Sequence, residues 1–319
     1  MGDSLRFTKA AQRHFAASPR RDPIRCRPLL ILASPRSFTS VVCAALGQHP
    51  QMYGLPELHL FVSDTLAGRK RFQARSKFNI DHGLLRVVAE LFFGGQTEDN
   101  VRRAARWLLR RTGFSPGYII RQIAAKVAPQ ILVEKSPSTG RAIEYLERAA
   151  DMFPGARFIH LVRHPRGQGE SVLKFLRERE KEGRVPAMHW MLHPQDVWLR
   201  VNRNICRFLD SIPAAQQRRV RGEDLLREPD AHLREIAVWL GLRTDPEAIA
   251  AMKHPENSPY ACFGPPGARG GYDPLFLKDP SLHPFSQKHQ SLLGPLSWSP
   301  DGSGFSKPIQ QLARAFGYE

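Results

Sequence analysis

Residues 28–46 read PLLILASPRSFTSVVCAAL, an apolar run that leads through a polar turn into a segment of small residues. The apolar run, 29–33, has the length of a buried strand, and a serine and a proline end it. A helix is expected to begin near Val41, with Thr39 or Ser40 as its capping residue. The stretch therefore predicts a strand, a turn and a helix of an α/β domain.

The turn of this unit has the composition of an anion-binding site. A helix N-terminus presents free backbone N–H groups and the positive end of the helix dipole. Arg36 adds a full positive charge, and the hydroxyl groups of Ser37, Thr39 and Ser40 add hydrogen-bond donors. A phosphate or a sulfate group would fit here, although an ordinary strand-to-helix connection explains a single turn of this kind equally well.

A second strand and turn carry similar chemistry. Residues 156–162 form an apolar strand, and Arg163 follows at its carboxyl end. A helix expected to begin near Gly169 places Ser171 in its first turn. Because ligands of open α/β sheets bind outside the carboxyl ends of the strands, Arg163 and Ser171 are expected to face one ligand. Two such sites on one sheet indicate a nucleotide that is anionic at both ends.

These blocks resemble sulfotransferases that use 3′-phosphoadenosine 5′-phosphosulfate (PAPS). Residues 35–40 are similar to the 5′-phosphosulfate loop of that family, and residues 163–171 to its 3′-phosphate motif. The resemblance covers most of the chain from residue 28 to about residue 280 and continues in three further blocks, 134–137, 220–226 and 264–277. It implies a central parallel sheet flanked by helices, the P-loop-like fold of bacterial-type sulfotransferases. It also implies sulfation of a hydroxyl group on a small-molecule or lipid acceptor, with no metal.

One position departs from the family pattern, because Phe38 stands where many members have glycine. A bulky side chain avoids positive φ, so the turn is expected to run through ordinary backbone angles there, with Phe38 lining the cofactor or acceptor site. A Walker-type phosphate loop requires G-x-x-x-x-G-K-[ST], which this stretch lacks. ATP and GTP are therefore not expected as ligands.

The resemblance further implies catalytic roles for charged residues. Arg36 is expected to stabilise the leaving phosphate and the sulfuryl oxygens, and Lys135 to point at the bridging oxygen; for Lys135, pairing with Glu134 is an equal alternative. Glu57 is the expected general base, with a pKa raised by partial burial. It lies 21 positions beyond Arg36, where several family members place a catalytic glutamate. His59 is the alternative base, and an N-terminal acid of a helix is the structural alternative for Glu57.

Further contacts to the nucleotide are expected from the C-terminal half. Arg221 follows the last expected strand and is a candidate ligand, although loop packing also explains it. In the glycine-rich loop 264–277, the backbone N–H groups of Gly267 and Gly270 and the side chain of Arg269 are expected to close over the 3′-phosphate. An inert surface loop is the alternative.

The remaining histidines and cysteines indicate structural roles. His160 lies inside a strand and is expected to pack in the core, and His164 is expected to support the 3′-phosphate turn. The cysteines have neither the spacing of a zinc site nor the density of a disulfide framework, and they are Cys26, Cys43, Cys206 and Cys262. Reduced thiols and a cytoplasmic location are expected.

The chain of 319 residues carries 47 Lys and Arg against 30 Asp and Glu, a formal charge of +17. This excess raises the question of nucleic-acid binding. The basic residues are spread along the chain without zinc-finger spacing or an aromatic-basic platform, so nucleic acid is not the expected partner. Attraction of a polyanionic cofactor, or an arginine-rich genome, explains the charge. No apolar run of transmembrane length and no secretory signal are apparent, and a soluble protein is expected.

The expected organisation is a basic tail or helix at 1–27 and a single sulfotransferase domain at 28–319. Within the domain, periodic apolar residues predict a helical insertion at 64–128 that shapes the acceptor pocket. Two other functions remain open. An N-sulfotransferase acting on an amine uses the same cofactor site, and a nonenzymatic nucleotide- or nucleic-acid-binding protein retains the site without the reaction.

Overall fold

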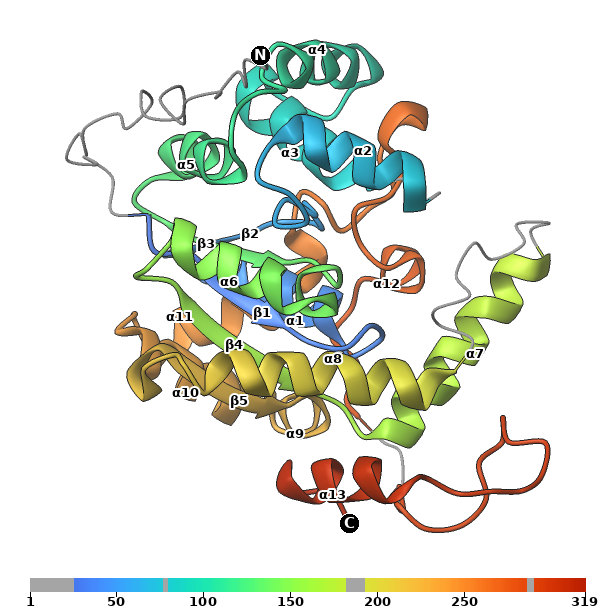
Figure 1. The fold of residues 1–319 in the computed structure, drawn as a ribbon. Coiled ribbons are helices and arrows are strands. Elements are labelled where there is room, and N and C mark those ends of the chain that lie inside the picture. The colour runs from blue at the N-terminus through green and yellow to red at the C-terminus, as the bar shows by residue number, and fades with distance from the viewer. Residues whose placement is uncertain (1–25, 77–79, 182–192, 286–289) are drawn as a thin grey trace, which may run out of the picture.

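The computed structural model describes residues 26–76, 80–181, 193–285 and 290–319. Within them, a sheet of five parallel strands has the order β2-β3-β1-β4-β5 (Figure 1). The strands are β1 Leu29–Leu32, β2 Met52–Gly54, β3 Ile131–Lys135, β4 Arg157–Val162 and β5 Gln217–Arg221. The expected α/β fold with a central parallel sheet is confirmed, whereas the expected tail lies almost entirely outside the described residues.

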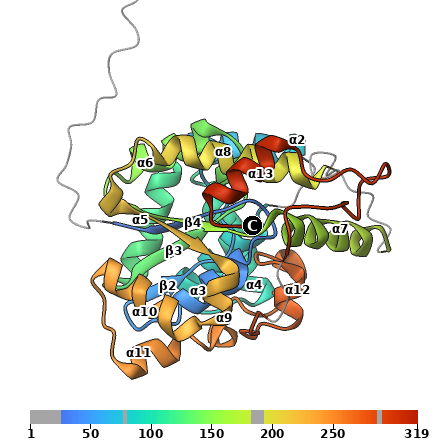
Figure 2. The same cartoon turned by 90° about the horizontal axis from the view of Figure 1, so that it is seen from below.

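Helices cover both faces of the sheet. Figure 2 shows α6 (Ile143–Met152) and α8 (Pro194–Leu209) along one side, and α10 (Pro229–Leu240) and α11 (Pro246–Ala251) along the other. All four residues of β1 are buried, as expected for a central strand of a parallel sheet covered on both faces. The buried sheet supplies a rigid base for the loops at its carboxyl edge.

Four helices follow β2 in the chain and lie together beyond one edge of the sheet (Figure 1). They are α2 Leu66–Ser76, α3 His82–Phe93, α4 Glu98–Leu109 and α5 Pro116–Val127. Side-chain caps begin two of them: Thr97 accepts a hydrogen bond from the Asn100 N–H, and Ser115 accepts one from the Tyr118 N–H. They occupy the stretch predicted as a helical insertion.

Two elements differ from what the sequence patterns indicate. β2 has no counterpart among the predicted strands, because a three-residue edge strand between prolines and glycines carries little periodic signal. The helix α7 (Pro165–Lys181) begins at Pro165, since proline fits the first turn of a helix, and not near Gly169. Ser171 therefore lies in its second turn. Lys135 is the last residue of β3.

The C-terminal segment 290–319, which includes α13 (Lys307–Ala315), packs against the start of α7 and against α8. A Cβ atom at Gly169 would lie 2.4 Å from the Trp298 ring, and one at Gly167 would lie 2.6 Å from the Gln290 side chain. The glycines of the predicted 3′-phosphate motif thus allow this segment to approach. Among the described residues, no helix is long and apolar enough to span a bilayer.

His160 lies on β4, fully buried as expected, and its Nε2–H donates to Asn202 Oδ1 at 2.9 Å. Burial lowers the pKa of His160 from 6.5 to about 3. Below pH 6.5, His160 binds a proton in the unfolded chain but stays neutral in the folded chain. The free energy of unfolding is therefore unaffected by His160 above that pH and decreases as pH falls toward 3.

Below pH 6.5, His160 should lower the free energy of unfolding of the wild type by about 1.4 kcal/mol per pH unit. We expect His160→Gln to abolish this pH dependence. Urea unfolding at pH 7.5 and at pH 5.5 gives the free energy of unfolding of the wild type and of the variant. The difference between the two proteins should change between these two pH values. An unchanged difference would show that His160 titrates normally in the fold.

Candidate active site

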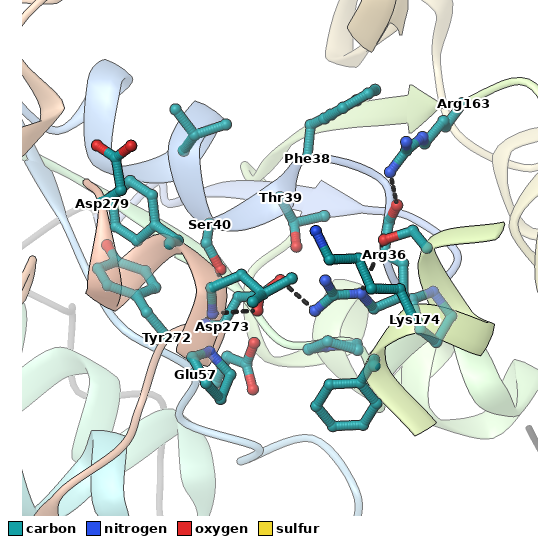
Figure 3. Close-up of a pocket in the computed structure, with 18 of the residues that line it drawn as sticks. Arg36, Phe38, Thr39, Ser40, Glu57, Arg163, Lys174, Tyr272, Asp273 and Asp279 are labelled. Carbon is teal, nitrogen blue, oxygen red and sulfur yellow. Dashed lines mark hydrogen bonds and ion pairs between the residues drawn. The ribbon is translucent and has the colours of Figure 1, made fainter. Parts of the chain in front are cut away.

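The carboxyl ends of three neighbouring strands meet at one edge of the sheet. Because β1 lies between β3 and β4, the turn after β1 lies beside Lys135 at the end of β3 and beside Arg163 after β4. This turn and Arg163 line a cavity of about 770 Å³ (Figure 3). The structure brings most predicted site residues together in the lining of this cavity. They are Arg36, Phe38, Thr39, Ser40, Glu57, His59, Arg163 and Ser171.

The turn after β1 contains two left-handed residues that are not glycine, Arg36 at φ 66° and Phe38 at φ 61°. The prediction that Phe38 has ordinary backbone angles is therefore wrong. Such a conformation costs on the order of 1–3 kcal/mol and persists only where its surroundings hold it. Arg163 Nη1 donates to the Arg36 carbonyl at 2.8 Å, and Gln168 Nε2 donates to the Pro35 carbonyl at 2.9 Å. Arg163 and Gln168 thus hold the turn after β1 in this strained shape.

The helix α1 (Thr39–Leu46) begins two residues earlier than predicted. Its N-cap is Phe38, which has no side-chain capping bond, so the expected caps Thr39 and Ser40 are instead its first two residues. Both line the cavity, while Ser37 is buried against the Ser34 hydroxyl at 2.9 Å. The backbone N–H groups of the first turn of α1 have no acceptor within the helix and suit an anion.

Lys135, Glu57 and His59 form one hydrogen-bonded cluster. The Lys135 side chain is completely buried, and its ammonium pairs with Glu57 Oε1 and donates to Ser40 Oγ at 2.9 Å. His59 Nε2 lies 3.2 Å from Glu57 Oε2, and its Nδ1 lies 2.8 Å from Ser138 Oγ. A carboxylate only accepts hydrogen bonds, so Nε2 carries the proton, and Nδ1 of the neutral ring accepts from Ser138. His59 therefore positions Glu57 through its Nε2–H.

The electrostatics of Glu57 differ from the prediction. Burial is the largest single influence and disfavours its charged form, but attraction to the Lys135 ammonium and the hydrogen bond and charge of His59 together outweigh burial and lower the pKa of Glu57 to about 2. The expected rise is therefore wrong, because sequence spacing does not show that Lys135 points at Glu57. Glu134, the residue before Lys135, accepts a hydrogen bond from the Ser136 hydroxyl. Its pKa is raised to about 7, chiefly by burial. Lys135 pairs with Glu57, not with Glu134.

Arg36 forms an ion pair with Asp273, a residue that sequence reasoning missed (Figure 3). Its Nε also donates to Ser171 Oγ at 3.2 Å. Asp273 caps the short helix α12 (Pro274–Lys278) by accepting from the Leu275 N–H at 2.9 Å. An Asp-Pro pair predicts such a helix start, but nothing in the pattern predicts the pairing with Arg36.

Arg163 and Ser171 line the same cavity, as the spacing predicted. Arg163 is partly buried, and burial lowers its pKa to about 10, so it remains charged at neutral pH. Its Nε atom is buried and has no hydrogen-bond partner among the described residues. A partly buried cation with an unused donor is the arrangement expected where an anionic ligand binds.

The structure does not bring Arg221, Gly267, Arg269 or Gly270 to the cavity. Arg221 donates to the Gly317 carbonyl at 2.7 Å in a separate, smaller hollow. The N–H groups of Gly267 and Gly270 bond Glu98 on α4 and His82 on α3, and the Arg269 guanidinium lies over the Phe263 ring. Only the end of the predicted closing loop, from Tyr272 onward, lines the cavity. The loop faces the helical insertion because its donors are bonded there.

Comparison with known proteins agrees with this geometry. The model of the sulfotransferase family matches residues 28–246, so the chain belongs to the sulfotransferase family. Its fold is that of the sulfotransferase domain from the curacin biosynthetic pathway, with 24% identity, a TM-score of 0.74, and coverage of 92% of this chain and 98% of that one.

Two further solved structures share the fold. The sulfotransferase domain of the Synechococcus PCC 7002 olefin synthase is 25% identical, with a TM-score of 0.70 over 92% of this chain and 95% of that one. A sulfotransferase from Mycobacterium avium is 17% identical, with a TM-score of 0.51 over 93% of this chain and 79% of that one. No curated protein matches the chain significantly.

We expect Lys135→Met to cost about 3 kcal/mol of unfolding free energy, because it leaves the partly buried Glu57 charge without its ion-pair partner and with only the His59 Nε2–H beside it. The double variant with Glu57→Gln should cost less than the sum of the single variants. Denaturant unfolding at pH 7 gives the coupling energy. It should decrease as pH falls from about 4.5 toward the folded pKa of about 2, and it should vanish only below that pKa, where Glu57 is neutral in both states.

Asp64→Asn is the matched control, because Asp64 pairs with Arg148 at the surface and 80% of its side chain is exposed. Its cost should stay below about 1 kcal/mol. Strict additivity of the Lys135 and Glu57 substitutions would contradict the coupled pair.

Proposed function

We propose that the protein transfers a sulfuryl group from PAPS to a hydroxyl group of a small-molecule or lipid acceptor. The observation that carries this proposal is a cavity with a cationic site at two places. The start of α1 and Arg36 form one, with the buried Lys135 bonded to Ser40 behind them, and Arg163 with its unused Nε donor forms the other. PAPS is a nucleotide with anionic groups at both ends. Membership of the sulfotransferase family supports the assignment.

The residues present fit this cofactor. Arg163 and Ser171 would hold the 3′-phosphate, and Arg36, Thr39, Ser40 and the first N–H groups of α1 would hold the phosphosulfate. When bound, PAPS supplies the sulfuryl group and leaves as 3′-phosphoadenosine 5′-phosphate. Arginine and lysine provide the positive charge at this site, and among the described residues no cluster of metal-binding side chains is present.

The chain's own residues supply the proton acceptor. In the transfer, the acceptor oxygen bonds to sulfur, the bond from sulfur to the phosphate oxygen breaks, and the hydroxyl proton passes to Glu57. At a pKa of about 2, Glu57 paired with Lys135 is a weak base. An anion that attracts the Lys135 ammonium away from Glu57 weakens the largest influence that lowers the pKa of Glu57, so that pKa rises. His59 keeps the carboxylate oriented through its Nε2–H.

Apolar side chains line part of the cavity wall, and they include Phe72, Ile80, Pro137, Phe175 and Phe276. An acceptor with an apolar portion fits this wall. The alternative N-sulfotransferase gains no specific support here. Incubation with sulfur-labelled PAPS and a metabolite extract, followed by mass spectrometry of labelled products, tests the proposal; binding of the nucleotide without any transfer would favour a nonenzymatic role.

We expect Arg163→Ala and Ser171→Ala each to weaken binding of 3′-phosphoadenosine 5′-phosphate by about 1–3 kcal/mol, the range for a lost charge-assisted hydrogen bond. Isothermal calorimetry measures it. As controls, Arg221→Ala and Arg269→Ala each remove the same charge as Arg163→Ala but outside the cavity. Both control variants should bind the nucleotide as the wild type does. Equal loss in all four variants would mean that general charge, and not this site, binds the nucleotide.

We expect Glu57→Gln to reduce turnover by roughly 100-fold or more, because the amide keeps the shape but accepts no proton. Affinity for 3′-phosphoadenosine 5′-phosphate should stay close to that of the wild type. His59→Ala should reduce turnover less, since it removes only the group that orients Glu57. Normal turnover of Glu57→Gln together with an inactive His59→Ala would assign the base to His59.

A further inference from the structure

We propose that Phe38 is a positioning residue that gives the cofactor site its preference for a 3′-phosphate, by holding the Arg163 guanidinium on the face of its ring. This inference rests on the function proposed above, which assigns Arg163 to that phosphate. The Cζ atom of Arg163 lies 4.1 Å from the centroid of the Phe38 ring, within the range of a cation–π contact. Figure 3 shows both side chains at the same end of the cavity.

The Phe38 ring is itself held by residues from two other segments. A Cβ atom at Gly222, where α9 (Gly222–Arg227) begins, would lie 2.5 Å from Phe38 Cδ2, so only glycine lets the ring take this place. On another side the ring meets Phe285 edge to face, with centroids 6.0 Å apart and an interplanar angle of 81°. The ring is therefore a fixed surface for the guanidinium.

The ring and one carbonyl together define the orientation of Arg163. The donors of a guanidinium lie in its plane, so the contact with the Phe38 face fixes that plane. Within it, the 2.8 Å hydrogen bond from Nη1 to the Arg36 carbonyl fixes the rotation. The buried Nε donor, which has no partner among the described residues, then keeps a constant direction. A preoriented donor binds an anion without first losing side-chain freedom.

The backbone of Phe38 shows that its side chain is the reason for its presence. At φ 61°, glycine would have no steric penalty, whereas phenylalanine is strained. Strain that the surroundings maintain points to a function of the strained residue. Glycine would lack the whole side chain, and the ring of that side chain contacts Arg163.

The test compares Phe38→Gly, Phe38→Leu and Phe38→Tyr in the full chain. Calorimetry gives the affinities for 3′-phosphoadenosine 5′-phosphate and for adenosine 5′-phosphate, and their ratio measures the 3′-phosphate preference. We expect the ratio to fall about 10-fold in the Gly and Leu variants, which lack a π face, and to stay within about 2-fold in the Tyr variant. Affinity for adenosine 5′-phosphate should change little, which a general structural defect would not allow.

Phe316→Leu is the matched control, because the Arg219 guanidinium lies over the Phe316 ring, 4.6 Å from its centroid, outside this cavity. It should leave the ratio unchanged. Thermal melting identifies any unfolded variant; if the Gly variant does not fold, the Leu and Tyr variants decide. A wild-type protein without 3′-phosphate preference would overturn the proposed function. A wild-type preference that persists in the folded Gly or Leu variants would overturn the role of Phe38 alone.

Discussion

Parallel pairing of β1 with both β3 and β4 determines where every charged group of the site lies. Strands of a parallel sheet end at the same edge, so the turn after β1 has Lys135 on one side and Arg163 on the other. Each of these cations contacts the central unit: Lys135 bonds Ser40 at the start of α1, and Arg163 bonds the Arg36 carbonyl. The central turn is therefore shaped by residues more than 90 positions away in the chain, which explains how it keeps two strained residues.

Before any ligand binds, the cations of the site are already partly neutralised. Arg36 pairs with Asp273 and Lys135 pairs with Glu57, each acid coming from a segment outside the anion-binding turns. Removing either acid would leave a poorly solvated cation, which is costly in a cavity of this kind. The pairs thus keep the empty site stable, and an incoming anion has to compete with them. Arg163 differs, because it contacts the Arg36 carbonyl and the Phe38 ring directly, whereas the Glu223 carboxylate attracts it without a hydrogen bond between them.

The sequence predicted those features that depend on local patterns. The apolar runs of β1 and β4, the cationic turns after them and the periodic helices between β2 and β3 all carry their own signal, and the structure places them as expected. The pKa of Glu57, the pairing of Asp273 and the left-handed angle of Phe38 were not predictable in this way. Each depends on a contact between distant segments, as with Phe38, whose ring requires both Gly222 and Arg163 beside it. The position of the loop 264–277 was not predictable for the same reason, since Glu98 and His82 accept hydrogen bonds from its N–H groups.

In the proposed reaction, with Glu57 as the base, the same Lys135–Glu57 pair would connect donor binding to acceptor activation. While Lys135 neutralises Glu57, the carboxylate has little tendency to take a proton, and its pKa of about 2 expresses this. An anion beside the start of α1 attracts the same ammonium, and any movement of Lys135 toward it leaves Glu57 with burial as the dominant influence on its pKa. By linkage, the base becomes stronger to the degree that the anion binds Lys135. A site built this way is poorly suited to remove a proton from an acceptor before the donor is in place.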